Sequence, residues 1–94
     1  MKEAGVGGNE LQVELETRAS REYRRLPPLV RDRIAEVVDD LQINPRPPGA
    51  KKLVGENGYR IRTGDYRILY AIDDQSGIIR IYRIGHRREV YRRQ

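Results

Sequence analysis

Apolar and polar residues alternate strictly near the start of the chain. Leu11, Val13 and Leu15 stand at every second position, and the residues between them are polar. A period of two is typical of a strand that buries one face. The segment 11–15 is therefore the first predicted strand.

The pattern then changes to a helical one. Thr17 is a suitable N-cap for a short helix, which Pro27 and Pro28 end before starting a second one. The apolar residues that share a face of the first helix are Ala19, Tyr23 and Leu26. Those of the second helix, with the strongest helical period in the chain, are Val30, Ile34, Val37, Val38 and Leu41. The sequence thus predicts a hairpin of two helices.

The segment Asn-Pro-Arg-Pro-Pro-Gly at 44–49 must break the second helix, because proline lacks the amide donor that a helix needs. Downstream, short apolar stretches are separated by Gly and Asp, which is typical of strands and turns. The predicted strands lie near 50–54, 58–63, 66–73 and 78–84. Consecutive strands joined by short turns predict an antiparallel meander.

These elements predict a small α+β domain with a leading strand, a helical hairpin and a meander. The helices are expected to cover one face of the sheet and to leave the other face concave and basic. A chain of 94 residues has room for one domain, so residues 1–94 are assigned to a single unit. Residues 1–9 contain three glycines and no apolar run, and are predicted to be a flexible leader, neither a signal peptide nor a membrane span.

Cysteine and histidine content limits the chemistry available to the chain. There is no cysteine and only one histidine, so a disulfide framework, a thiolate nucleophile and a zinc site are not expected. The sequence gives no reason to expect another metal or a small-molecule cofactor. A cytoplasmic location is the simplest interpretation.

Charge is distributed unevenly along the chain, whose formal net charge is +5. Residues 1–44 contain 7 Lys+Arg and 9 Asp+Glu, a net charge of −2, whereas residues 45–94 contain 12 and 5, a net charge of +7. Sixteen of the 19 basic residues are arginine, whose planar guanidinium binds a phosphate in two places at once. The second half of the chain therefore favours an anionic partner, and a solvated basic surface without a partner is the alternative.

Four arginines and a tyrosine are the main candidates for contacts with that anion. One predicted strand places Arg60 and Arg62 on the same face, opposite its apolar residues. Arg67 follows on the neighbouring strand, and the sequence leaves open whether it lies beside Arg60 or beside Arg62. Arg87 and Tyr91 are four residues apart, so they share one side if the chain turns helical after the last strand.

This set of side chains suits cleavage of RNA without a metal. In that reaction the 2′-hydroxyl attacks its own phosphate, which requires a proton acceptor, stabilisation of the added negative charge and a proton donor for the leaving 5′-oxygen. The arginines can stabilise the charge, and Tyr91 or Tyr66 can stack on a base and hold the backbone for in-line attack. His86 is the group with an ordinary pKa near neutrality, so it is the candidate for proton transfer, with Glu89 behind it.

Some of these residues have plainer explanations. Lys51 and Lys52 are either solubilising loop residues or phosphate anchors, and Arg88 is a further candidate RNA contact. A lone histidine after a strand, such as His86, is more often a surface or capping residue than a catalyst. At least two tyrosines are expected to replace the missing Phe and Trp in the core. The candidates are Tyr59, Tyr66, Tyr70 and Tyr82.

Several motifs, in this order along the chain, resemble the RelE branch of the RelE/ParE toxins. They are Leu-Pro-Pro at 26–28, Asn-Pro-Arg-Pro-Pro-Gly-Ala-Lys-Lys-Leu at 44–53, Tyr-Arg-Ile-Arg at 59–62, Gly-Asp-Tyr-Arg-Ile-Leu-Tyr at 64–70 and Ile-Gly-His-Arg-Arg-Glu-Val-Tyr at 84–91. The resemblance runs from about Leu11 to Tyr91. It implies a toxin that enters the ribosomal A site, cleaves the mRNA there to leave a 2′,3′-cyclic phosphate, and is silenced by a cognate RelB-like antitoxin that wraps it.

The resemblance also implies roles for individual residues. The family's two basic residues on a sheet strand fall on Arg60 and Arg62, and the arginine of its Asp-Tyr-Arg motif falls on Arg67. The arginine after the last strand falls on Arg87, and the C-terminal tyrosine falls on Tyr91. The best-known members have lysine where this chain has the first two arginines, and one of those lysines is the favoured base. That departure favours the histidine for proton transfer here.

Two other functions stay open on the sequence. A ParE-like inhibitor of DNA gyrase resembles this chain in its helices and has no nuclease activity, but such proteins lack the joint set of Arg67, Arg87 and a terminal tyrosine. A basic module that binds RNA or the ribosome without cleaving is the other alternative, since arginine in place of the family's lysines would allow it.

Overall fold

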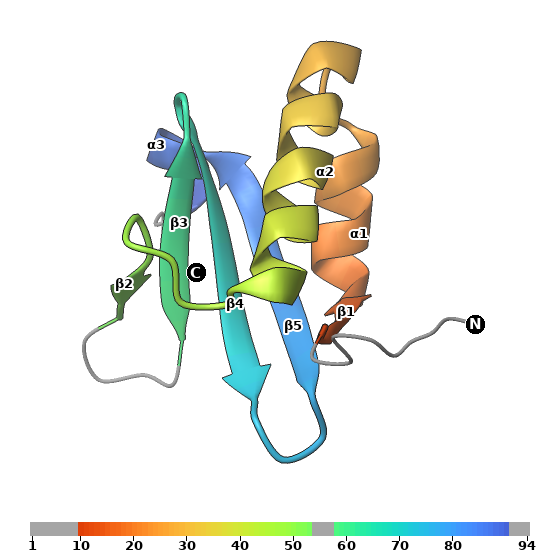
Figure 1. The fold of residues 1–94 in the computed structure, drawn as a ribbon. Helices are drawn as coiled ribbons and strands as arrows, with labels where there is room; N and C mark the ends of the chain where they lie inside the picture. The colour runs from red at the N-terminus through yellow and green to blue at the C-terminus, as the bar shows by residue number, and fades with distance from the viewer. Residues whose placement is uncertain (1–9, 54–57, 91–94) are drawn as a thin grey trace.

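The computed structural model describes residues 10–53 and 58–90, without the side chains of residues 89 and 90. These residues form an α+β domain in which two helices pack against a five-stranded sheet, as the sequence predicts (Figure 1). The elements in chain order are β1 Gln12–Leu15, α1 Thr17–Arg24, α2 Pro28–Ile43, β2 Lys51–Lys52, β3 Tyr59–Thr63, β4 Tyr66–Asp73, β5 Ile78–His86 and α3 Arg87–Val90. Within the described ranges, each helix is too short or too polar to cross a membrane.

The strands lie in the order β1-β5-β4-β3-β2. Strands β2 to β5 pair antiparallel with their neighbours in sequence, which confirms the predicted meander. β1 pairs parallel with β5, with Gln12 opposite Ile78 and Leu15 opposite Ile81, so the sheet is mixed. Because β1 is short, the last residues of β5 extend beyond it.

Helices α1 and α2 lie side by side on one face of the sheet (Figure 1). Ile34 and Leu41 of α2 are seven positions apart, therefore on one side of the helix, and both are buried in the core. The buried core residues are Ala19, Ile34, Leu41, Ile68, Tyr70, Ile79, Ile81 and Ile84. Alternation along β3 and β4 turns Arg60, Arg62 and Arg67 to the opposite face of the sheet, which we call the basic face.

Arg46 fastens the loop after α2 to the sheet. Its Nε donates to the hydroxyl oxygen of Tyr59 (3.0 Å), and its Nη2 lies 2.9 Å from a carboxylate oxygen of Asp74 in the β4–β5 turn. The hydroxyl of Tyr70 donates to the carbonyl oxygen of Pro45 (2.7 Å). The rings of Tyr59 and Tyr70 stack with centroids 5.7 Å apart, so two tyrosines have the predicted packing role.

The start of α1 differs from the prediction. Thr17 is the first helical residue, not the cap; Glu16 occupies the N-cap position, without a side-chain cap hydrogen bond. The backbone N–H of Glu16 still bonds to the carbonyl oxygen of Ile81 (2.9 Å), as a continuation of β1. The chain therefore passes directly from strand to helix, and the predicted capping role of Thr17 is wrong.

Four of the five strands differ from their predicted bounds. β1 and β3 each begin one residue later than predicted, at Gln12 and Tyr59, and the other two differ by more. The strand predicted over 50–54 contains only Lys51–Lys52, because its pairing with β3 is limited to these two residues. β5 continues to His86, two residues beyond the predicted end at 84, because His86 pairs with Tyr66. The predicted leader 1–9 lies outside the described residues.

Candidate functional site

The strand register arranges residues of the basic face in two rows across β3, β4 and β5. The row nearest the β3–β4 turn consists of Arg62, Arg67 and Gly85. The next row consists of Arg60, Leu69 and Arg83. The register also decides the question that the sequence leaves open, since Arg67 lies directly opposite Arg62.

Arg67 is the buried member of the first row. Only 8% of its surface is exposed, although it lies on the face opposite the core. Its Nε has no hydrogen-bond acceptor in the part of the chain that the structure describes. The guanidinium is always charged, and a buried donor without an acceptor is unfavourable. A buried arginine with an unsatisfied donor marks this end of the basic face as a candidate site for an anion, which the other guanidinium nitrogens would contact.

A tight turn brings Arg87 to the same end of the sheet. Gly64 and Asp65 form a two-residue turn between β3 and β4, and Gly64 has a φ of 61°, the left-handed value that a type II′ turn requires at its first position. The carbonyl oxygen of Asp65 accepts a hydrogen bond from the N–H of Arg87 (2.8 Å). This contact holds the start of α3 against the turn.

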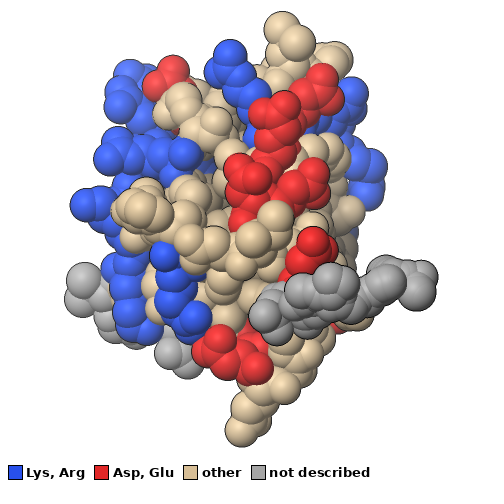
Figure 2. Space-filling model, viewed as in Figure 1, with Lys and Arg blue, Asp and Glu red and all other residues tan. Residues whose placement is uncertain are grey.

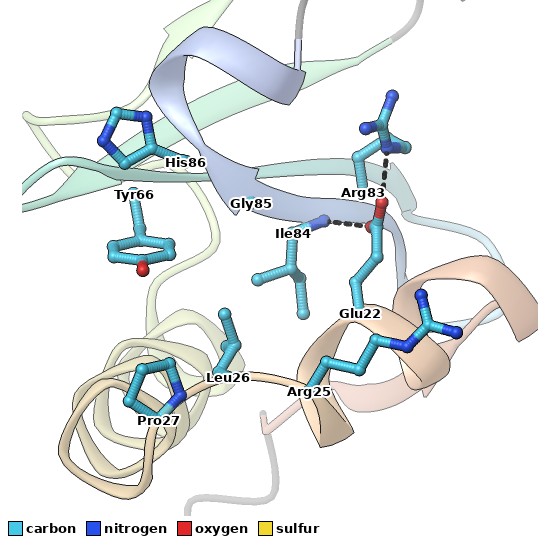
Figure 3. Close-up of a pocket in the computed structure, with 9 residues that line it drawn as sticks. All are labelled: Glu22, Arg25, Leu26, Pro27, Tyr66, Arg83, Ile84, Gly85 and His86. Atoms are coloured by element: carbon cyan, nitrogen blue, oxygen red, sulfur yellow. Dashed lines mark hydrogen bonds and ion pairs between the residues drawn. The ribbon is translucent and has the colours of Figure 1, made fainter.

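His86 and Tyr66 lie on the other side of the sheet from Arg67. They are directly opposite each other on β4 and β5, and their rings make an edge contact with centroids 5.7 Å apart. Figure 3 shows both rings beside a cleft of about 410 Å³, whose wall also includes Leu26 and Pro27 from the connection between α1 and α2. We call this the Tyr66 cleft.

One hydrogen bond defines the protonation of His86. Its Nδ1 accepts from the backbone N–H of Arg88 (3.2 Å). A neutral imidazole has one acceptor and one donor nitrogen, so this contact assigns the ring proton to Nε2. The structure therefore divides the predicted catalytic set. Arg60, Arg62 and Arg67 lie on the basic face, Arg87 begins α3 at the same end of the sheet, and His86 lies on the cleft side.

Glu22 of α1 holds the end of β5. Its carboxylate accepts from the backbone N–H of Ile84 (2.8 Å) and from Nε of Arg83 (3.0 Å), as Figure 3 shows. Nε of Arg18 lies 3.5 Å from the same carboxylate. β1 stops at Leu15, so Glu22 provides the acceptor where β5 has no neighbouring strand on that side.

The two lysines lie at the far edge of the sheet. Lys51 and Lys52 are exposed and form β2, where Lys51 pairs with Arg60. Nζ of Lys52 lies 5.3 Å from the centre of the Tyr59 ring, a cation–π contact. Lys51 thus extends the basic face sideways from the second row.

Helix α3 carries two exposed arginines, Arg87 and Arg88. The predicted helical turn after the last strand is therefore present. Tyr91 and the side chain of Glu89 lie outside what the structure describes, so their predicted roles stay predictions. In residues 10–53 and 58–90, no three His, Cys, Asp or Glu side chains are grouped so that they could hold a metal ion.

Arg83 is a site residue that the sequence does not reveal. Leu69 pairs with Arg83 but the next residue, Tyr70, pairs with Ile81, so Tyr82 is an extra residue in β5. Strict alternation would turn Arg83 to the core side with Ile81. The bulge reverses this, and no glycine or proline in the local sequence marks it.

The fold and the site together define a class of protein. A helical hairpin covers one face of a small sheet, and arginines gather at one end of the other face. Such a concentration of guanidinium groups is suited to a polyanionic chain.

Known proteins of this kind match the chain over most of its length. Residues 13–91 match the family model for the ParE toxin of the type II toxin–antitoxin system parDE. The chain is 35% identical over 85 residues to Toxin RelG of Mycobacterium tuberculosis, and this match covers 86% of this chain and 95% of that protein. It resembles a chain of the toxin–antitoxin complex RelBE2 from Mycobacterium tuberculosis with a TM-score of 0.74 and 32% identity, covering 82% of this chain and 98% of that one.

A structure from an archaeon is similar to the same extent. A chain of the RelE–RelB complex from Pyrococcus horikoshii has a TM-score of 0.75 and 27% identity, covering 85% of this chain and 98% of that one. The protein therefore belongs to the RelE/ParE toxin superfamily and is a toxin of a type II toxin–antitoxin system.

Proposed function

We propose that the protein is a ribosome-dependent endoribonuclease that cleaves mRNA in the A site. The observation that carries this proposal is the buried guanidinium of Arg67, whose Nε lacks an acceptor among the described residues. A charge that is held by its surroundings does not have to reorganise when negative charge develops beside it. The likeness of the site motifs to the RelE branch supports the same activity.

Three arginines would surround the scissile phosphate. Arg67 lies opposite Arg62, and the contact between Asp65 and Arg87 holds α3 at the same end of the sheet. As the 2′-oxygen attacks, the phosphate gains negative charge, and the guanidinium groups bind this transition state more tightly than the substrate. Arg60, one row away, would contact a neighbouring phosphate.

His86 is the proposed proton-transfer residue, and it would reach the phosphate around the end of the sheet, since its ring lies on the side opposite Arg67. To act as the acid, His86 must first be the imidazolium, with a proton on each ring nitrogen, so the hydrogen bond from the Arg88 N–H to Nδ1 opens. It then donates its Nε2 proton to the 5′-oxygen as the bond between phosphorus and that oxygen breaks, and the attacking 2′-hydroxyl releases its own proton to water. The new bond joins the 2′-oxygen to phosphorus, so the products are a 2′,3′-cyclic phosphate and a free 5′-hydroxyl. Tyr91 is proposed to stack on a base and hold the backbone in line.

Exposed basic residues outside this centre would bind the RNA of the ribosome or the message. Lys51, Lys52 and Arg88 are exposed and can contact phosphates without burial of their charge. Such contacts position the protein and carry no sequence information. The proposal places the protein in the cytoplasm, with translating ribosomes.

We also expect a RelB-like antitoxin. The similar structures from Mycobacterium tuberculosis and Pyrococcus horikoshii are complexes of a toxin with its antitoxin. An uncontrolled mRNA nuclease would harm its host, and a basic face suits an acidic segment that folds as it binds.

The test uses ribosomes stalled on a defined mRNA with an empty A site, and maps the RNA ends by primer extension. We expect the wild-type protein to cut within the A-site codon. Arg67→Ala should lower the cleavage rate about 100-fold or more, because it removes a preorganised donor to the developing charge. Arg21→Ala removes an exposed arginine of α1, outside the basic face, and should cleave like the wild type.

Three outcomes would contradict the proposal in different ways. Equal cleavage by wild type and Arg67→Ala would show that the reaction occurs elsewhere. Absence of cleavage together with inhibition of gyrase supercoiling would indicate the ParE-like activity. Ribosome binding without cleavage would indicate a module that has lost catalysis.

A further inference from the structure

Apart from His86, the side chains that line the Tyr66 cleft have no part in the proposed cleavage. It lies on the helix side of the sheet end, between β4, β5 and the connection from α1 to α2 (Figure 3). Its volume of about 410 Å³ is within the range of small-ligand sites. A pocket of this size accommodates one nucleotide more readily than a folded protein segment.

The walls of the cleft combine cationic and flat apolar groups. Arg25 and His86 contribute nitrogen donors, Tyr66 contributes an aromatic ring, and Leu26 and Pro27 contribute apolar surface. A nucleotide has the complementary chemistry, since it joins an anionic phosphate to a flat base. Stacking on an aromatic ring and contact with arginine is the usual way in which proteins bind single-stranded RNA.

The one carboxylate among the residues that line the cleft is already neutralised. Glu22 accepts from the N–H of Ile84 and from Arg83, and Arg18 lies beside it. Its charge is therefore largely balanced before any ligand arrives. The guanidinium of Arg25, by contrast, forms no hydrogen bond or ion pair within residues 10–53 and 58–90, and is available to a phosphate.

The cleft and the basic face share one residue at the end of the sheet. Gly85 forms part of the cleft wall and is also the partner of Arg67 in the first row. Tyr66 precedes Arg67 in β4, and the two side chains turn to opposite faces. A strand of RNA that passes this end can thus place one phosphate beside Arg67 and the adjoining nucleotide beside Tyr66.

We propose that the Tyr66 cleft binds the nucleotide next to the scissile phosphate of single-stranded RNA, with the base on Tyr66 and its phosphate on Arg25. The inference rests on the proposed nuclease function in one respect, namely that the same RNA strand occupies both sides of the sheet end. It adds a site on the helix side to the arginines of the basic face.

The test compares two neighbouring arginines, Arg24 at the end of α1 and Arg25 directly after it. Arg25→Ala and Arg24→Ala each remove one exposed positive charge, but Arg24 bonds to Ser20 (2.9 Å) and does not line the cleft. The probe is a short fluorescein-labelled single-stranded RNA with 2′-O-methyl groups, which cannot be cleaved, and the measurement is fluorescence anisotropy. We expect Arg25→Ala to weaken binding about tenfold and to lower the salt dependence by about one unit, with Arg24→Ala within about twofold of the wild type.

Two variants of Tyr66 test the stacking part of the proposal. Tyr66→Leu should weaken binding about tenfold because the ring is lost, whereas Tyr66→Phe keeps the ring and should bind within about twofold of the wild type. Circular dichroism and thermal unfolding of each variant establish that the fold is intact. Rescue by phenylalanine separates stacking from a general effect of the substitution.

The proposal is overturned if Arg25→Ala and Tyr66→Leu bind the probe as Arg24→Ala does, or if the wild type does not bind it at low salt. It is also overturned if these variants lose affinity only for the antitoxin, which would make the cleft a protein site. The probe assay involves neither ribosomes nor cleavage, so its result is independent of the cleavage test. Loss of probe binding in a protein that cuts no mRNA would support the cleft and contradict the nuclease.

Discussion

Tyr70 shows how one buried side chain joins the sheet to the loop after α2. It is completely buried, and its hydroxyl donates to the carbonyl oxygen of Pro45. Burial, and to a smaller extent the neighbouring Tyr59, raises the pKa of Tyr70 from 10.0 to about 12. The folded protein therefore requires the neutral hydroxyl, both to avoid a buried charge and to keep its donor.

We expect the free energy of unfolding to fall as the pH rises from about 10 to about 12. In that window Tyr70 keeps its proton in the folded state but loses it in the unfolded state, so rising pH favours unfolding. Below pH 10.0 both states are protonated and the contribution is constant. Denaturant titrations at several pH values would compare the wild type with Tyr70→Phe.

The phenylalanine variant isolates this single group. It lacks the hydrogen bond to Pro45 and should be about 1 kcal/mol less stable than the wild type near neutral pH. Because it cannot ionise at position 70, the difference between the two proteins should shrink in the alkaline window. A difference that stays constant would show that Tyr70 does not titrate as described.

Individual site residues were predictable where simple alternation holds. The pattern Tyr-Arg-Ile-Arg turns Arg60 and Arg62 away from the core, and the structure confirms this. The partner of Arg67 was not predictable, because it depends on Gly64 and Asp65 forming a turn of two residues. Such a register depends on both strands and on the turn between them, so the sequence of one strand does not predict it.

At the scale of elements, the end of β5 depends on a helix and not on a strand. β1 pairs with only the first part of β5, and Glu22 of α1 takes over at Ile84. Three residues later the chain reaches Arg87. A carboxylate from α1 therefore holds the segment that delivers a proposed catalytic arginine.

We expect Glu22→Ala to loosen this segment. The N–H of Ile84 would lose its acceptor in a partly buried place, which costs about 1 to 3 kcal/mol and lowers the melting temperature by several degrees. Hydrogen exchange of the Ile84 amide should become faster than in the wild type. Cleavage in the stalled-ribosome assay should fall with it, because Arg87 would be less well placed.

An exposed glutamate of α2 offers a matched control. Glu36→Ala removes the same charge from an exposed position of α2, and should leave both the Ile84 amide and cleavage unchanged. If the Ile84 amide remained equally protected in Glu22→Ala, the anchoring role of Glu22 would be excluded.

The elements themselves were largely predictable because each has a local signal. The helical period of α2, the proline-rich break after it and the apolar stretches of the meander are each visible within a short stretch of sequence. The parallel pairing of β1 with β5 has no such signal, because its two strands are far apart in sequence. The same is true of the contact between Glu22 and Ile84.

At the scale of the whole molecule, acidic and basic side chains occupy different regions. Figure 2 shows an acidic band along α2, with Lys and Arg gathered on the left of the view, over β2, β3 and α3, and further basic side chains at the top and on the right beside that band. The exposed acidic residues of α2 are Asp32, Glu36, Asp39 and Asp40. The side that carries β2, β3 and α3 is therefore the basic side, and the band along α2 is acidic, a separation that would orient the protein towards an anionic surface.

We expect binding to ribosomes to weaken steeply with salt. If the proposed contacts of Arg60, Arg62, Arg67 and Arg87 each neutralise a phosphate, they alone give a slope of about −3 for the logarithm of affinity against the logarithm of salt concentration, and contacts of Lys51, Lys52 and Arg88 would make it steeper. Arg62→Gln should reduce this slope by about one unit, whereas Glu36→Gln should leave it nearly unchanged. Sedimentation with ribosomes at several salt concentrations would measure both, and equal slopes for the two variants would contradict the assignment of the basic side.

The pairing of the first strand with the last has a consequence during synthesis. Gln12 pairs with Ile78, which is 66 positions later, so β1 waits unpaired while the chain is made at about 5 to 20 residues per second. β5 also supplies Gly85, the residue that completes the first row beside Arg67. A nascent chain therefore lacks an assembled site until β5 has left the exit tunnel, so a chain with the proposed activity would not cut the message from which it is being made.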